Sequence, residues 1–247
     1  MEILDVEAIR RAEPCLAPLY HKGVRFTDAC HLDTPFRYAL ALAGAIRQRG
    51  GELVQGEARG LASANDGVEA VLDHGTLKAD RIVVACGAWS KPLAASMRDR
   101  VLLDTERGYH VVFPDRGSLL NEPCCYPERG FYLTPLEEGL RAAGTVELGG
   151  LDAAPRAARI EMIARAARKL VPELGEAGRV WVGFRPSMPD SLPVIGPSPH
   201  DARVIYAFGH GHIGLTLAGV TGRIVSDLIS GFDPPLDIEP LRPARFH

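Results

Sequence analysis

The sequence has little that would tie it to nucleic acid, to a bilayer or to an export route. Lys and Arg together number 28 against 31 Asp and Glu, and the net charge of −3 argues against nucleic-acid binding. No apolar run is long enough to span a membrane, because the most apolar stretch, residues 205–229, is interrupted by His, Arg, Asp and Gly. The N-terminus also lacks the basic segment and apolar core of a signal peptide.

Cysteine is scarce and unpatterned. The five cysteines are odd in number, and none of them form a C-x-x-C pair. This usage favours a reducing compartment and argues against a structural zinc site, so we expect no metal centre. Cys124 and Cys125 are neighbours, which would close a strained ring if oxidised, so we predict ordinary loop and strand residues. We expect a cytoplasmic protein, either free or peripheral to the inner membrane.

Local patterns in the first hundred residues predict alternating helices and strands. Asp33-Thr34-Pro35 combines a capping residue with a first-turn proline and predicts a helix with one apolar face that ends at Gly50-Gly51. The run 81–86 is continuously apolar, which is typical of a strand buried on both faces. Further predicted elements are a helix at 5–11, strands at 23–26 and 52–58, and a hairpin of 68–72 with 76–78.

The middle of the chain has a different pattern. Residues 101–113, 130–134 and 140–147 predict strands of an antiparallel sheet, with a turn at Glu137-Glu138-Gly139. An Ala- and Arg-rich amphipathic helix is predicted at 157–170, and Pro172 would end it. This block predicts a separate layer of sheet plus helix.

The end of the chain returns to a strand, a turn and a helix. Residues 204–208 predict a strand and 214–229 a helix, whereas 234–247 predict a loosely held tail. The fold class is therefore α/β at both ends with an antiparallel sheet between them, α+β over the whole chain. We predict a partial Rossmann-like lobe over 1–98, an antiparallel lobe over 99–180, and a return to the first lobe over 181–247. The cleft that such a return makes is a common ligand site.

A glycine turn joins the last strand to the last helix. Gly209, Gly211 and Gly214 spell G-x-G-x-x-G, but no strand with a terminal acidic residue follows, so a complete dinucleotide unit is not predicted. A helix start still offers free N–H groups and a partial positive charge to a flat or anionic group. Tight packing between strand and helix is the equally weighted alternative.

Five ordered motifs resemble one family. They are I-V-V-A-C-G-A-W-S at 82–90, E-R-G-Y-H-V at 106–111, F-Y-L-T-P-L-E-E-G-L-R-A-A-G-T-V-E at 131–147, W-V-G-F-R-P-S-M-P-D-S-L-P-V-I-G at 181–196 and A-F-G-H-G-H-I-G-L-T-L-A at 207–218. Together they resemble FAD-dependent D-amino-acid oxidoreductases, which include D-amino-acid dehydrogenases and glycine and sarcosine oxidases. The resemblance implies an incomplete FAD-binding lobe and a substrate lobe with an antiparallel sheet.

The resemblance also implies roles for individual residues. Arg185 matches the arginine that binds the substrate carboxylate, and a guanidinium suits that bidentate contact; a surface ion pair is the alternative. Tyr109 and His110 would lie over the substrate, with ordinary core packing as the alternative, and Tyr132 is weighted toward the core. The residues implied to line FAD are Gly87, Ala88, Trp89, Pro193, Gly196, Gly209, His210, Gly211, His212 and Gly214.

The family opens with a unit that this sequence does not show. That unit is a strand, a G-x-G-x-x-G and an acidic residue, which hold the ADP half of FAD. We therefore expect the chain to be a fragment or a truncated product that holds FAD less tightly than a whole family member.

Three functions follow. The first is oxidation of a D-amino acid, a small zwitterion, to an imine and then a 2-oxo acid, with a hydride moving from Cα to flavin N5 and electrons passing to a quinone or a carrier protein. The second is a non-catalytic subunit or remnant of such an enzyme. The third is oxidation of a secondary amine such as sarcosine, proline or hydroxyproline.

Overall fold

The computed structural model describes residues 1–246, which divide by their contacts into two compact units. Unit 1 contains Met1–Leu53, Gly108–Glu147 and Ala154–Gly183, and unit 2 contains Val54–Arg107, Leu148–Ala153 and the residues from Phe184 on. The chain therefore passes between the units several times. The domain boundaries expected from the sequence stay a prediction.

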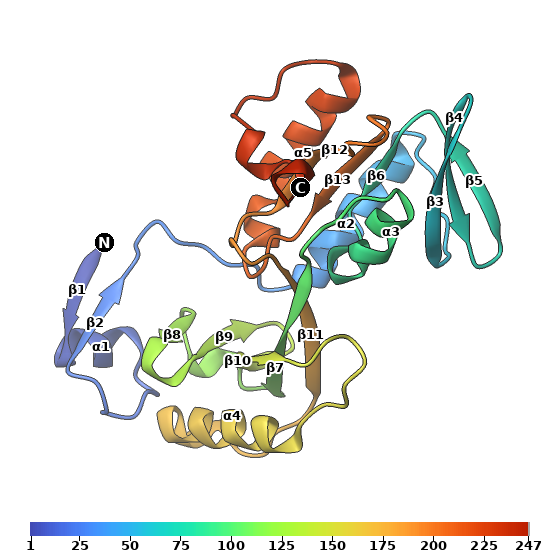
Figure 1. The fold of residues 1–247 in the computed structure, drawn as a ribbon. Coiled ribbons are helices and arrows are strands. Elements are labelled where there is room, and N and C mark those ends of the chain that lie inside the picture. Colours follow the sequence, from blue (N-terminus) through green and yellow to red (C-terminus); the bar gives the residue numbers. More distant parts are fainter. Residues whose placement is uncertain (247) are drawn as a thin grey trace. The chain divides into compact units, whose positions relative to one another are not determined.

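Unit 1 is built on a five-stranded sheet with the order β11-β7-β10-β9-β8 (Figure 1). Its strands are β7 (Asp104–Phe113), β8 (Cys124–Tyr126), β9 (Phe131–Leu136), β10 (Gly139–Leu148) and β11 (Val180–Ser187), of which β7, β10 and β11 also give residues to unit 2. The turn predicted at Glu137-Glu138-Gly139 is confirmed, with Gly139 already paired to Leu136 as the first residue of β10.

One helix covers one face of this sheet. The helix α4 (Ala157–Leu170) has the bounds that the sequence predicts, and its Ile163, Ala164, Ala167 and Leu170 pack into one core with Tyr109, Val111, Phe113, Leu133, Leu140 and Ala142. Successive residues of a strand point to opposite faces. Tyr109 therefore faces α4, whereas its neighbour His110 lies on the other face.

The first 53 residues of unit 1 form a small hairpin with a helix, followed by a longer helix. The elements are β1 (Glu2–Asp5), α1 (Val6–Ala12), β2 (Lys22–Arg25) and α2 (Pro35–Gln48). The helix α2 begins at the predicted proline, but Thr34 does not cap it. Its hydroxyl instead donates to Glu137 Oε2 at 2.8 Å, so the predicted cap is corrected. No residue of α2 is buried, although the sequence gives the helix an apolar face.

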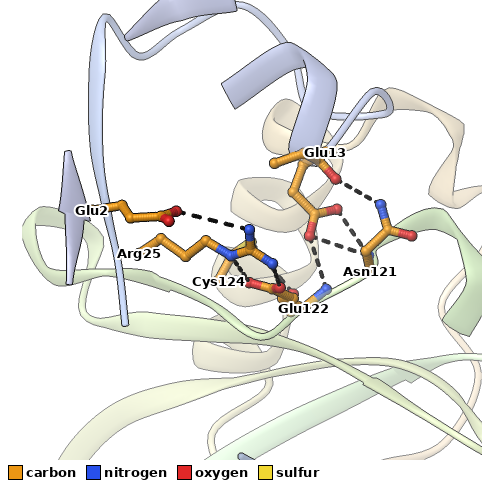
Figure 2. Close-up of polar contacts among 7 residues, drawn as sticks. Glu2, Glu13, Arg25, Asn121, Glu122 and Cys124 are labelled. Carbon is orange, nitrogen blue, oxygen red and sulfur yellow. Dashed lines mark hydrogen bonds and ion pairs between the residues drawn. The ribbon is translucent and has the colours of Figure 1, made fainter. Parts of the chain in front are cut away.

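Buried and half-buried carboxylates fasten the N-terminal hairpin to the loop before β8 (Figure 2). Glu13 accepts hydrogen bonds from the backbone N–H groups of Asn121, at 2.9 Å, and Glu122, at 2.8 Å. Glu122 in turn binds the guanidinium of Arg25 through Nε at 3.1 Å. Burial raises the pKa of Glu13, and the two N–H donors partly offset this effect. A single carboxylate thus satisfies two backbone donors more than 100 residues away in the sequence.

Unit 2 contains two three-stranded sheets. The first has the order β12-β13-β6 and the second β3-β4-β5. The elements are β3 (Ala58–Ala64), β4 (Gly67–Leu72), β5 (Gly75–Ala79), β6 (Ile82–Val84), α3 (Ser90–Ser96), β12 (Val194–Pro197), β13 (Val204–Phe208) and α5 (Gly214–Ser230). The hairpin of β4 and β5 confirms the predicted one, because Leu72 pairs with Gly75.

Three predictions for unit 2 are wrong. Residues 52–57 form no strand: Leu53 and Val54 are about half exposed, and no neighbouring strand among the described residues pairs with them. The strand β6 is not buried on both faces, because it is the edge strand of its sheet and Val83 is 36% exposed. The C-terminal segment is docked rather than loose: Ile238 is buried, and Arg245 donates to Leu192 O at 2.7 Å.

The contact of Glu13 generates a stability prediction. Glu13→Ala leaves the backbone N–H groups of Asn121 and Glu122 without their acceptor, and each lost hydrogen bond costs about 1–3 kcal/mol of stability. We expect the free energy of unfolding in urea to fall by that order. Glu7→Ala, an exposed change in the helix α1 that Glu13 directly follows, is the matched control. Equal effects of the two substitutions would contradict a fastening role for Glu13.

Candidate functional site

The parallel pairing of β6 with β13 brings two distant turns to one edge of a sheet. Val204 pairs with Ile82 and Tyr206 with Val84, so the carboxyl ends of both strands lie at the same edge. Gly87 follows one strand and Gly209 the other. In open α/β sheets, this edge is where ligands bind. Pro193 lies at the same edge, because the antiparallel strand β12 begins after it and Val194 pairs with Phe208.

The glycines of this edge have backbone conformations that other residues rarely adopt. The φ angles of Gly87, Gly209 and Gly211 are +56°, +88° and +55°. A Cβ at Gly209 would lie 2.8 Å from Met188 Cγ, so the protein itself requires glycine there. A Cβ at Gly87 would meet nothing within 4 Å, and one at Gly211 would meet only Ser187 Oγ at 3.9 Å. The backbone is thus open to a ligand at two points of the edge.

The glycine turn is hydrogen-bonded to the strand that carries Arg185. Gly211 donates its backbone N–H to the carbonyl of Pro186 at 2.8 Å. The 17-residue helix α5 begins directly after this turn at Gly214, and no side chain caps its N-terminus. Uncapped N–H groups and a partial positive charge therefore lie beside the strand of Arg185.

Two charged groups share the surroundings of Arg185. Burial lowers the pKa of Arg185, and the nearby carboxylate of Glu106 partly offsets this. The Oε2 atom of Glu106 also lies 3.8 Å from Nδ1 of His212. Burial lowers the pKa of His212 as well, and the charge of Arg185 adds to that effect. His212 is therefore favoured as the neutral imidazole beside one guanidinium and one carboxylate.

Glu106 is a functional candidate that the sequence reasoning missed. The only signal in the sequence is the place of Glu106 in the motif E-R-G-Y-H-V, for which the resemblance implies roles for Tyr109 and His110 but not for Glu106. In the structure, Glu106 gives the site of Arg185 a charge of the opposite sign. One cation and one anion together match the charges of a zwitterion.

Other predicted cofactor residues surround this edge or face the protein. Ala88 is buried, and Trp89 is 54% exposed with its ring 5.6 Å from that of Phe184 in an edge-on contact. His210 contacts α5, because its Nε2 lies 2.9 Å from Thr221 Oγ1. Gly196 differs from the rest: its open side faces the C-terminal segment, where a Cβ would lie 3.5 Å from Arg242 Cγ. We therefore leave Gly196 out of the proposed site.

Tyr109 and His110 belong to unit 1, and their surroundings differ. Tyr109 is 1% exposed, its hydroxyl donates to Glu147 Oε2, and it accepts the backbone N–H of Arg156 at 3.1 Å. The hydroxyl is thus occupied within the core, which corrects the expectation that it meets a substrate. His110 stacks on Trp181, with ring centroids 5.0 Å apart, and lines a pocket of unit 1. Tyr132 is 54% exposed, so its expected core position is wrong.

Among residues 1–246, no group of three or more His, Cys, Asp or Glu side chains is arranged to hold a metal ion. No helix in the same range is long and apolar enough to cross a bilayer.

Comparison with known proteins assigns the family. The family model for FAD-dependent oxidoreductases matches residues 1–228. The chain belongs to this family. It is 40% identical over 249 residues to a protein named D-amino-acid oxidase from Bradyrhizobium diazoefficiens, and 31% identical over 273 residues to a D-amino acid dehydrogenase from Xanthobacter autotrophicus. The alignments cover 98% and 99% of this chain, and 59% and 60% of those relatives. The chain thus spans about three fifths of their length.

A solved structure gives the same result for the fold. The chain superposes on glycine oxidase from Geobacillus kaustophilus with a TM-score of 0.88 and 26% identity. The superposition covers 98% of this chain and 66% of that one. The cofactor of the family is FAD, and the open glycine edge of unit 2 fits a flat group. The recognised resemblance and the expected mixture of a partial Rossmann-like lobe with an antiparallel lobe are confirmed.

The surroundings of His110 generate a pH prediction. Burial, together with the charges of Arg141 and Arg179, lowers the pKa of His110 to about 4. In the unfolded chain, an ordinary histidine takes up a proton near pH 6.5. Protonation therefore favours the unfolded state as the pH falls from about 6.5 to 4, and the stability that neutral His110 contributes is lost in that window. We expect His110→Phe, which keeps a ring against Trp181, to lose less stability over this range.

Urea denaturation at several pH values measures this difference. The control is His74→Phe, which removes a half-exposed histidine of unit 2 whose Nδ1 lies 2.6 Å from Asp73 Oδ1. Parallel pH profiles of wild type and His110→Phe would show that His110 does not titrate as described.

Proposed function

We propose that this chain forms the substrate-binding and flavin-facing part of an FAD-dependent oxidoreductase that oxidises a D-amino acid to an imine. Water would convert the imine of a primary amine to a 2-oxo acid and ammonia. The observation that carries the proposal is the hydrogen bond from Gly211 to Pro186, which holds the glycine turn beside the strand of Arg185. A carboxylate-binding guanidinium and the positive end of a helix are thereby neighbours.

In this proposal, Arg185 binds the substrate carboxylate through paired charge-assisted hydrogen bonds. The carboxylate of Glu106 interacts electrostatically with Arg185 and lies near His212. In this proposal it faces the substrate's amino group and helps to select a zwitterion. Neutral His212 keeps a second positive charge away from the amine. The amine must itself be neutral when its Cα–H bond breaks.

FAD would supply the redox chemistry, because its N5 atom accepts the hydride from the substrate Cα. The residues of this chain that would hold the ring are Gly87, Gly209, Gly211 and Gly214 with Pro193, Ala88 and Trp89. The uncapped start of α5 would stabilise negative charge that develops on the reduced ring. The family name and the names of the relatives support FAD and an amino-acid substrate.

Two alternatives stay open within this proposal. A secondary amine such as sarcosine, proline or hydroxyproline would use the same carboxylate contact with Arg185. A non-catalytic subunit would keep the fold without binding FAD. For the electron acceptor we propose a quinone or a carrier protein, as the dehydrogenase-named relative suggests, and rapid production of peroxide in air would contradict it.

Binding of FAD is the first test. The purified chain, incubated with FAD and desalted, is expected to keep flavin absorbance near 450 nm. Gly87→Ala places a methyl group in the open space of the edge and is expected to weaken FAD binding at least tenfold. Gly231→Ala is the matched control, since Gly231 also has a positive φ, +77°, and open space, at the end of α5. A folded chain without flavin absorbance would favour the non-catalytic subunit, and equal effects of both variants would remove Gly87 from the site.

The carboxylate contact is tested in an FAD-loaded preparation that oxidises D-alanine. Arg185→Ala is expected to raise KM for D-amino acids by two orders of magnitude or more, because a buried bidentate contact contributes several kcal/mol. Arg203→Ala is the control, since it removes a partly exposed cation of the same unit just before β13, at the end of that strand away from Gly209. An unchanged KM in Arg185→Ala would exclude Arg185 from substrate binding, whereas a matching rise with D-proline would identify the secondary amines as substrates.

A further inference from the structure

Unit 1 has a pocket of its own on the sheet face that α4 leaves open. Its volume is about 620 Å³, and every lining residue belongs to unit 1. The lining residues are Asp33, Thr34, Pro35, Phe36, His110, Leu136, Glu137, Glu138, Arg141, Arg179 and Trp181. They come from β7, β9, β10 and β11, the turn between β9 and β10, and the start of α2.

The walls of this pocket are flat and apolar. His110 and Trp181 stack at an interplanar angle of 23°, and Leu136 and Phe36 add aliphatic and aromatic surface. Trp181 is 57% exposed, so a large part of its ring remains available for contact. Aromatic surface of this kind suits a planar apolar body.

Two arginines of the pocket share one carboxylate. Arg141 donates from Nη2 to Glu138 Oε1 at 2.6 Å, and Arg179 donates to the other oxygen of Glu138. Nε of Arg141 is buried and has no hydrogen-bond partner among the described residues. A buried guanidinium N–H without an acceptor is costly, and one carboxylate cannot satisfy two five-donor groups. The side chains of Arg141 and Arg179 are 27% and 68% exposed, so further N–H groups of the pair are accessible to an anionic acceptor.

The remaining carboxylates of the pocket do not supply that acceptor. Glu137 accepts from Thr34 at 2.8 Å and from Arg37 at 3.0 Å. Asp33 contributes its backbone carbonyl to the same corner, 3.4 Å from the N–H of Glu137. Glu137 lies in the same turn as Glu138, but its carboxylate is bound to residues at the start of α2.

We propose that this pocket binds a small organic carboxylate with a planar, apolar body. The carboxylate would accept N–H groups of Arg141 and Arg179, and the body would lie against Trp181 and His110. An amino acid and a simple carboxylic acid share this chemistry, so both are candidate ligands. The proposal goes beyond the proposed function, because it concerns residues of unit 1 alone and requires neither FAD nor catalysis.

Tryptophan fluorescence provides a direct test, since the chain has two tryptophans and only Trp181 lines the pocket. In the Trp89→Phe background, Trp181 alone reports binding to the full chain. Three probes share a benzyl group: phenylacetate is an anion, D-phenylalanine a zwitterion and 2-phenylethylamine a cation. We expect phenylacetate to change the emission of Trp181 in a saturable way, and 2-phenylethylamine to bind at least tenfold more weakly.

D-phenylalanine distinguishes the two sources of the carboxylate. Binding as tight as that of phenylacetate would support an amino-acid ligand, and much weaker binding would support a simple carboxylic acid. Binding of 2-phenylethylamine as tight as that of phenylacetate, or no saturable change with any probe, would overturn the proposal.

Charge-removing variants complete the test. Arg141→Gln and Arg179→Gln are each expected to raise the Kd for phenylacetate at least tenfold. Arg11→Gln, an exposed arginine of unit 1 outside the pocket, is expected to leave it unchanged. Arg179 is 68% exposed, so its variant keeps the test decisive if Arg141→Gln unfolds, as far-UV circular dichroism would reveal. An unaltered Kd in Arg179→Gln would overturn the assignment of the carboxylate to this pair.

Discussion

The parallel pairing of β6 with β13 is the constraint on which the candidate site depends. These two short strands are far apart in the sequence, since Val204 pairs with Ile82, and their register brings the turns after them to one edge. Neither turn would be a ligand site alone, because a glycine at a strand end is common. Their meeting beside the uncapped start of α5 makes an open, positively polarised backbone surface.

Unit 1 depends on a different constraint, the alternation of side chains along its strands. Tyr109, Val111 and Phe113 of β7 pack against α4, and the residues between them face away from the helix. The same strand therefore supplies the core with Tyr109 and the pocket with His110. Burial and a nearby pair of arginines then keep the imidazole of His110 uncharged, so the stacked wall that it forms with Trp181 stays apolar.

The sequence predicts well those helices and strands whose formation depends on residues close together in the sequence. The hairpin of β4 and β5 follows from its turn residues, and α4 follows from its apolar period and the proline after it. The failures concern partners distant in the sequence. Residues 52–57 have strand-like composition but no pairing neighbour, and the tail has loop-like composition but docks through Arg245. The secondary-structure propensity of a short segment cannot predict whether a distant segment will pair or pack with it.

The site follows the same division. Arg185 and the glycine turn could be proposed from motifs, because each motif contains the chemical groups that its proposed role requires. Glu106 could not, since its role comes only from lying near Arg185 and His212. Tyr109 was misleading for the converse reason: its hydroxyl finds its partners in Glu147 and Arg156, on residues that no local pattern connects to it.

The adjacency of Tyr109 and His110 has a consequence for how β7 can change. Because the side-chain period of a strand is two, inserting or deleting one residue before Gly108 while keeping the ladder would turn Tyr109 away from α4 and His110 toward it. A deletion would place the imidazole beside Glu147, and an insertion would place the phenol against Trp181. We therefore expect length variation in this strand to occur in pairs of residues, or at its ends, whereas substitutions at the solvent-facing positions are tolerated singly.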